Sequence, residues 1–88
     1  MLGQIIEKEQ IQEYKIISAD TDRSAALRDR LQDAQRLGNE FKSKTSIVFQ
    51  TEDGPKRIET TVWSLTENYV QIKSGVVIPL KSIIEVEL

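Results

Sequence analysis

The sequence predicts an α+β protein in which one N-terminal helix, or two, is followed by five short strands forming an antiparallel, strongly bent sheet. One observation is a change of composition in the low forties, where Gln, Glu, Arg, Asp, Ala and Leu give way to Thr, Val, Ile and aromatic residues. An apolar stripe at helical spacing precedes this change, and β-rich runs separated by minimal turns follow it. The 88 residues allow a single domain, with a helical segment over 1–43 and a β unit over 44–88.

A helix is predicted over residues 22–38. Asp20 and Asp22 offer N-cap oxygens before a run of good helix formers, and Gly38-Asn39 suits a left-handed cap at the other end. Apolar side chains recur at spacings of four, three, three and four, at Leu27, Leu31, Ala34, Leu37 and Phe41. This stripe must be covered by the β unit or by a partner.

The first 18 residues leave two interpretations open. Leu2, Ile5 and Ile6 suit a helical turn, whereas the Glu-Tyr-Lys-Ile-Ile run over 13–17 suits a short strand. A first helix over about 3–15 is the preferred prediction. The alternative is an extended or partly disordered leader.

Turn signals divide the second half of the chain into strands. Asp53-Gly54 supplies a turn, and Pro55 cannot donate a ladder hydrogen bond. Thr66-Glu67-Asn68 and Ser74-Gly75 give two further turns, and a single helical turn is predicted over 79–82. The predicted strands cover 45–51, 56–65, 69–73, 76–78 and 83–88.

The register of the 57–73 hairpin leaves two choices. A two-residue Glu67-Asn68 loop pairs Trp63 with Ile72 and Leu65 with Val70. A three-residue loop that includes Thr66 instead groups the neighbouring apolar set, Ile58 and Val62, with Val70 and Ile72. The first register is preferred because it buries the only tryptophan, and a strand that bends midway would satisfy both groups.

The order of these elements over 45–88 resembles the SH3-like and Sm-like small barrels, and the helix over 22–38 matches the helix that precedes the barrel in Sm-like proteins. The resemblance implies a five-stranded barrel. Glu67 is similar to the acidic residue that Sm-like proteins carry near the second hairpin, whereas Pro79-Leu-Lys-Ser82 stands where they carry a basic residue and glycine. The segments Ile58–Trp63 and Val77–Leu80 also resemble short uncharacterised proteins of Bacteroidetes-type bacteria, which implies a bacterial origin.

Composition argues against most enzyme chemistry. The chain has no cysteine and no histidine, which removes thiolate and imidazole metal ligands, a cysteine nucleophile and the usual general base. Its four glycines form no phosphate-binding motif. We therefore expect no enzyme activity, no cofactor and no metal. The absence of a signal-peptide pattern and of a long apolar run predicts a cytoplasmic protein without membrane contact.

Charge makes nucleic acid a weaker candidate partner than protein. Twelve basic and fourteen acidic residues give a formal charge of -2. Cations and rings that could contact RNA or single-stranded DNA lie on the predicted strands at Lys56, Arg57, Tyr69, Lys73 and Lys81. Outward lysines and arginines also protect strand edges from pairing, which is the simpler interpretation.

The sequence therefore predicts a non-enzymatic protein-interaction module that self-associates. An open sheet edge can accept another strand, and an uncovered helix stripe can meet a partner. The stripe residues predicted to form the interface are Leu27, Leu31, Leu37 and Phe41. Weak binding of RNA or single-stranded DNA is the alternative.

Overall fold

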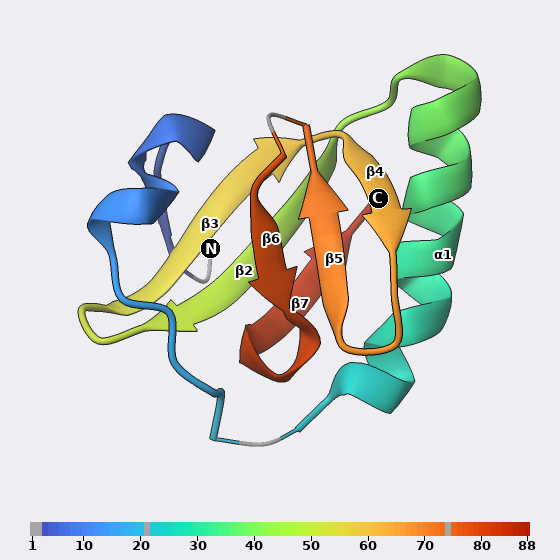
Figure 1. Ribbon diagram of the computed structural model, residues 1–88. Coiled ribbons are helices and arrows are strands. Elements are labelled where there is room, and N and C mark those ends of the chain that lie inside the picture. Colours follow the sequence, from blue (N-terminus) through green and yellow to red (C-terminus); the bar gives the residue numbers. More distant parts are fainter. Residues whose placement is uncertain (1–2, 21, 74) are drawn as a thin grey trace.

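The computed structural model describes residues 3–20, 22–73 and 75–88, and within them the chain forms one α-helix, two 3-10 helices and seven strands. The strands make a four-stranded sheet in the order β1-β3-β2-β7 and a three-stranded sheet in the order β4-β5-β6 (Figure 1). The helices are η1 (Lys8–Glu13), α1 (Ser24–Phe41) and η2 (Leu80–Ser82), and the strands are β1 (Gln4–Ile5), β2 (Thr45–Thr51), β3 (Gly54–Thr60), β4 (Val62–Leu65), β5 (Tyr69–Ile72), β6 (Val77–Pro79) and β7 (Ile83–Glu87).

The predicted five-stranded SH3-like or Sm-like barrel is wrong, because neither sheet closes on itself. The extended runs lie close to the predicted positions, but the long strand over 56–65 is interrupted at Thr61. Its first part, β3, joins the four-stranded sheet, and its second part, β4, joins the other sheet. Ser74 of the predicted third turn lies outside the described residues.

The predicted first helix over 3–15 is also wrong. Gln4 and Ile5 form a short parallel strand on β3, opposite Lys56 and Arg57. After this strand, the chain makes the 3-10 helix η1. Ile6 and Ile11 are buried in the main core, so tertiary packing overrides the weak helical pattern of this segment.

The helix α1 forms where the stripe predicts one and continues to Phe41. The N-cap is Arg23 rather than the predicted Asp20 or Asp22, and the Ser24 N–H donates to the Asp22 carboxylate at 2.9 Å just before the helix begins. Hydrogen bonds from Ser24 lower the pKa of the Asp22 carboxyl below its usual value of 3.8. Leu31 and Ala34 are fully buried in the core, because α1 packs on β4 and β7. The stripe is therefore covered largely by the protein's own sheets.

The second hairpin combines both predicted registers. Leu65 pairs with Val70 across the two-residue Glu67-Asn68 loop, but a bulge then brings Val62 opposite Ile72. The bulge leaves Trp63 without a cross-strand partner in β5, and its side chain is 47% exposed. The prediction that Trp63 lines the core is wrong, because Val62 takes that position.

One hydrophobic core joins the two sheets and the helix. Its fully buried members come from α1 and from both sheets, and the largest are Phe49, Leu31, Ile47, Ile58, Ile72, Ile78 and Ile83. In the described part of the chain, no helix combines the length and apolar character needed to cross a bilayer.

Candidate functional site

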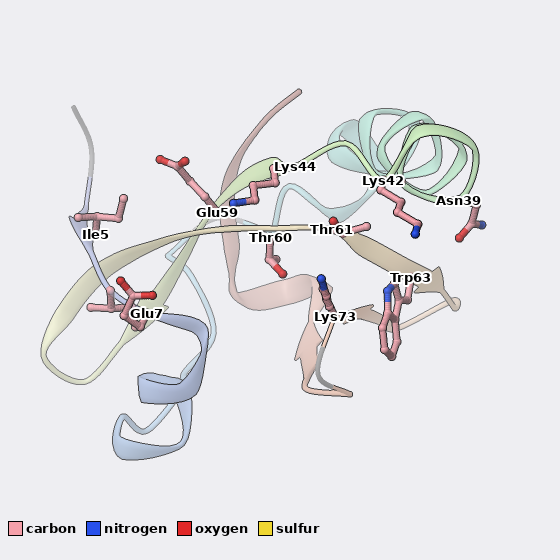
Figure 2. Close-up of a pocket in the computed structure, with 12 residues that line it drawn as sticks. Ile5, Glu7, Asn39, Lys42, Lys44, Glu59, Thr60, Thr61, Trp63 and Lys73 are labelled. Carbon is pink, nitrogen blue, oxygen red and sulfur yellow. The ribbon is translucent and has the colours of Figure 1, made fainter.

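A groove of about 690 Å³ lies where the N-terminal segment, the end of α1 and the corner between β3 and β4 meet. This volume falls in the range of roughly 300–1,000 Å³ that is typical of small-ligand pockets. Figure 2 shows the side chains around it, which come from β1 and the residues after it, the end of α1 and its connection to β2, the corner between β3 and β4, and the residue after β5. The residues that shape its chemistry are Lys42, Lys44, Thr60, Thr61, Trp63 and Lys73.

Part of the β3 edge in this groove has no strand partner among the described residues. The Ile6 N–H donates to the Arg57 carbonyl at 2.8 Å, and β1 ends at Ile5. Farther along, the Lys73 N–H donates to the Thr61 carbonyl at 2.8 Å. Because alternate residues of a strand direct their backbone groups to the same edge, Glu59 presents its N–H and C=O between these two bonds. The edge is therefore open over a short stretch at Glu59.

Thr60 brings a buried polar atom to the groove. Its residue is only 3% exposed, because it shares the inward face of β3 with Ile58. The Thr60 hydroxyl has no hydrogen-bond partner within the described chain. The oxygen has almost no accessible surface, so a ligand in the groove does not reach it, and its unpaired burial costs about 1–3 kcal/mol of stability.

Three exposed lysines from different parts of the chain line the groove: Lys42 after α1, Lys44 before β2, and Lys73 after β5. In the described part of the chain, no carboxylate lies within ion-pair distance of their ammonium groups. Glu7 and Glu59 also line the groove, so its charge is mixed, with the positive side nearer the end of α1 (Figure 2).

Lys42 adopts a left-handed backbone conformation, with φ of 55°. Its N–H donates to the carbonyls of Leu37 and Gly38, so it closes the helix at a position that glycine usually occupies. A side chain in this conformation costs about 1 kcal/mol relative to glycine. The helix termination accounts for this conformation, and Lys42 is a candidate binding residue because its exposed ammonium lines the groove.

Trp63 provides an apolar wall on the β4 side of the groove. The bulge turns its ring away from the core, and the ring stands near Lys73 in Figure 2. A half-exposed indole can pack against a planar or branched group and can donate one hydrogen bond through its N–H. The sequence singled out Trp63 as a core residue, and only the bulge makes it part of a site.

The five predicted nucleic-acid residues do not form one surface. Lys56 and Arg57 are each only 6% exposed. The Lys56 ammonium bonds the Gln4 side chain at 2.9 Å and lies 4.9 Å from the centre of the Tyr14 ring. Tyr69 and Lys81 line a separate hollow of about 340 Å³, and Lys73 alone of the five lines the groove.

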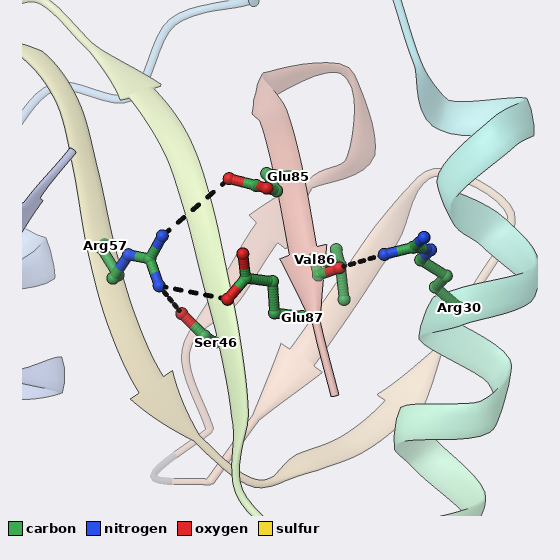
Figure 3. A network of polar contacts seen from close by, with 6 residues as sticks. All are labelled: Arg30, Ser46, Arg57, Glu85, Val86 and Glu87. Atoms are coloured by element: carbon green, nitrogen blue, oxygen red, sulfur yellow. Dashed lines mark hydrogen bonds and ion pairs between the residues drawn. The ribbon is translucent and has the colours of Figure 1, made fainter. Parts of the chain in front are cut away.

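Arg57 belongs to a polar network on the β2, β3 and β7 sheet (Figure 3). Its guanidinium donates to the Ser46 hydroxyl at 2.8 Å and forms ion pairs with Glu87 at 3.6 Å and Glu85 at 3.9 Å. The Arg30 side chain donates to the Val86 carbonyl at 3.0 Å and so covers one backbone group of β7. These contacts give Arg57 a structural role.

The four predicted interface residues divide between core and surface. Leu31 is completely buried, and Leu27 and Leu37 are partly buried. Phe41, at the last position of α1, is 69% exposed. Only Phe41 is therefore largely available to a partner.

Sequence reasoning missed the groove because its members are far apart in the chain. Lys42 and Lys44 lie in a connection, Thr60 lies within a strand, and no motif joins them to Lys73. The one local signal is that Lys42 and Lys44 flank the change from helical to β-rich composition. Among residues 3–20, 22–73 and 75–88, no cluster of acidic side chains is suited to hold a metal ion.

Comparison of the chain with protein-family models, with curated proteins and with solved structures gives no match.

Proposed function

We propose that the chain is a non-enzymatic protein-interaction module that holds an extended segment of a partner protein in the groove. The segment adds a strand to β3 at Glu59. The observation that supports this is the open stretch of β3 edge between the Ile6 bond to Arg57 and the Lys73 bond to Thr61. Strand addition to an exposed edge is a common mode of peptide recognition, in which backbone hydrogen bonds supply affinity.

The edge favours a peptide over a nucleic acid because it offers a donor and an acceptor. The Glu59 N–H needs an acceptor, and the Glu59 C=O needs a donor. A peptide backbone supplies both groups at every residue other than proline, whereas the phosphates of a nucleic acid only accept and a donor has to come from a base or a ribose hydroxyl. Weak binding of RNA or single-stranded DNA stays the alternative proposal, and it would rely on Lys73 with the other groove lysines, because Lys56 and Arg57 are buried.

A proline at Glu59 tests strand addition directly. The probes are two capped octapeptides with a central phenylalanine, one alternating threonine with glutamate and the other alternating threonine with glutamine. We expect Glu59→Pro to weaken binding of the tighter peptide by about tenfold or more. The proline removes the N–H at the edge of β3, and its ring occupies space that the added strand needs. Isothermal titration calorimetry measures the affinities, and amide NMR shifts of the wild-type protein locate the contact.

The matched control is Glu59→Thr, which keeps the N–H and suits a strand. Proline is tolerated where the N–H faces an open edge, so both variants should fold. Circular dichroism and melting curves check this. Equal peptide affinity in the proline and threonine variants would exclude strand addition at Glu59.

Self-association is a second proposal, which the exposed Phe41 ring favours. An aromatic ring that is 69% exposed at the end of a helix can pack against the same ring of another copy. We expect light scattering at micromolar concentration to give a mass above 10.1 kDa, and Phe41→Ala to shift it toward the monomer. A wild-type mass of one chain would end this proposal.

A further inference from the structure

We infer that the segment recognised in the groove is acidic, with carboxylates that face Lys42, Lys44 and Lys73 and an apolar side chain that packs on Trp63. This inference rests on the proposed strand addition and adds the chemistry of the partner.

The lysines are the strongest evidence for an acidic segment. The chain as a whole carries a formal charge of -2, and several of its other cations pair with carboxylates, as Lys15 does with Glu52 and Arg36 with Asp33. By contrast, the three groove lysines have no ion-pair partner among the described residues. Two of them come from the connection between α1 and β2 and the third follows β5, and together they give the groove a positive side that an anionic ligand complements.

The spacing of charge in the ligand separates a peptide from a polyphosphate. In an extended peptide, alternate side chains point to opposite faces, so carboxylates at every second residue can all face one side. Glu7 and Glu59 line the same groove, and their carboxylates repel a polyphosphate, which carries a negative charge at every unit. An alternating acidic peptide can place its carboxylates on the lysines and its uncharged residues toward Glu7 and Glu59.

Trp63 adds a further requirement. The half-exposed indole offers an apolar surface close to Lys73, which suits a ring or a branched side chain in the segment. The inferred ligand is therefore an extended acidic peptide interrupted by one bulky apolar residue.

The experiment compares the threonine–glutamate octapeptide with its threonine–glutamine counterpart, both with the central phenylalanine. We expect the glutamate peptide to bind about tenfold more tightly in low salt, with the difference shrinking as salt rises. A triple variant, Lys42→Gln with Lys44→Gln and Lys73→Gln, should remove that preference. Trp63→Ala should weaken both peptides by a similar factor.

A charge-matched control separates local recognition from net charge. Lys15→Gln, Arg36→Gln and Lys81→Gln together remove the same number of positive charges from exposed positions that do not line the groove. We expect this triple variant to keep most of the preference for the glutamate peptide. An equal loss of preference in both triple variants would overturn the inference.

The remaining outcomes distinguish this inference from the proposed function. Binding of the two peptides with equal affinity, blocked by Glu59→Pro, would refute the acidic preference and leave strand addition intact. Failure of both peptides to bind would refute both proposals. Tighter binding of an oligothymidylate, with a steep loss of affinity in salt, would replace the peptide with single-stranded nucleic acid.

Discussion

Phe49→Ala is expected to lower the free energy of unfolding by about 3–5 kcal/mol. Phe49 lies in β2, at the centre of the four-stranded sheet, and its side chain is fully buried. Truncation of a buried phenylalanine costs about 3–5 kcal/mol through lost apolar burial and the cavity that remains. Since a domain of this size has a total stability of roughly 4–13 kcal/mol, the change removes much of it.

Chemical denaturation followed by circular dichroism measures this loss. The control is Leu88→Ala, the truncation of an apolar side chain that is 59% exposed and has no part in the proposed interactions. Since little apolar surface is lost there, we expect a change of at most about 0.5 kcal/mol. Equal effects of the two substitutions would contradict the placement of Phe49 in the core.

Gly38→Ala is expected to lower stability by about 2 kcal/mol, although alanine favours helices. A Cβ at Gly38 would lie 2.7 Å from the Val62 carbonyl oxygen and 2.9 Å from the Thr61 Cγ2. The oxygen belongs to the backbone of β4 and can move only if the helix shifts away from the sheet. Overpacking costs about 3 kcal/mol at the upper end of its usual range. This exceeds the gain of about 1 kcal/mol in helix propensity.

Asn39→Ala is the matched control for the glycine substitution. Asn39 is the next residue of α1 and is exposed, so its side chain has room to change. We expect a gain of about 0.5 kcal/mol from helix propensity alone. A stabilising effect of Gly38→Ala in thermal or denaturant unfolding would show that α1 and β4 are not in close contact at this point.

The glycine contact also links the core to the groove. Gly38 lines the groove, and its close approach to Thr61 and Val62 fixes the end of α1 beside the corner between β3 and β4. Lys42 lies one turn after Gly38 and directly follows the last residue of α1. A shift of α1 in Gly38→Ala should therefore weaken peptide binding and lower the free energy of unfolding. Asn39→Ala should instead raise the free energy of unfolding slightly.

Local signals accounted for most element positions. The Asp53-Gly54 turn joins β2 and β3, where Thr51 pairs with Gly54 and Gly54 has φ of 101°. The predicted two-residue loop at Glu67-Asn68 also matches the pairing of Leu65 with Val70. These features depend on residues that are neighbours in the chain, so turn chemistry and apolar spacing suffice to predict them.

Features that depend on contacts between distant residues were not predicted from the sequence. Neither segment carries a local pattern that indicates the pairing of Gln4 with Lys56. The apolar spacing of the N-terminal segment therefore led to the prediction of a helix. Burial of Arg57 depends on Glu85, Glu87 and Ser46, which are far from it in the chain, and the charge alone suggested an exposed residue.

From residue 22 onward, the amino-acid order by itself determined where the chain is helical and where it is extended, because turn residues and apolar spacing act over a few neighbouring positions. Tertiary structure alone decided that β3 and β4 separate at Thr61, that Trp63 faces outward and that three lysines meet beside an open edge. These outcomes follow from competition among side chains for one small core, in which Val62 replaces Trp63 next to Ile72. Packing between segments that are far apart in the sequence decides which of these side chains is buried.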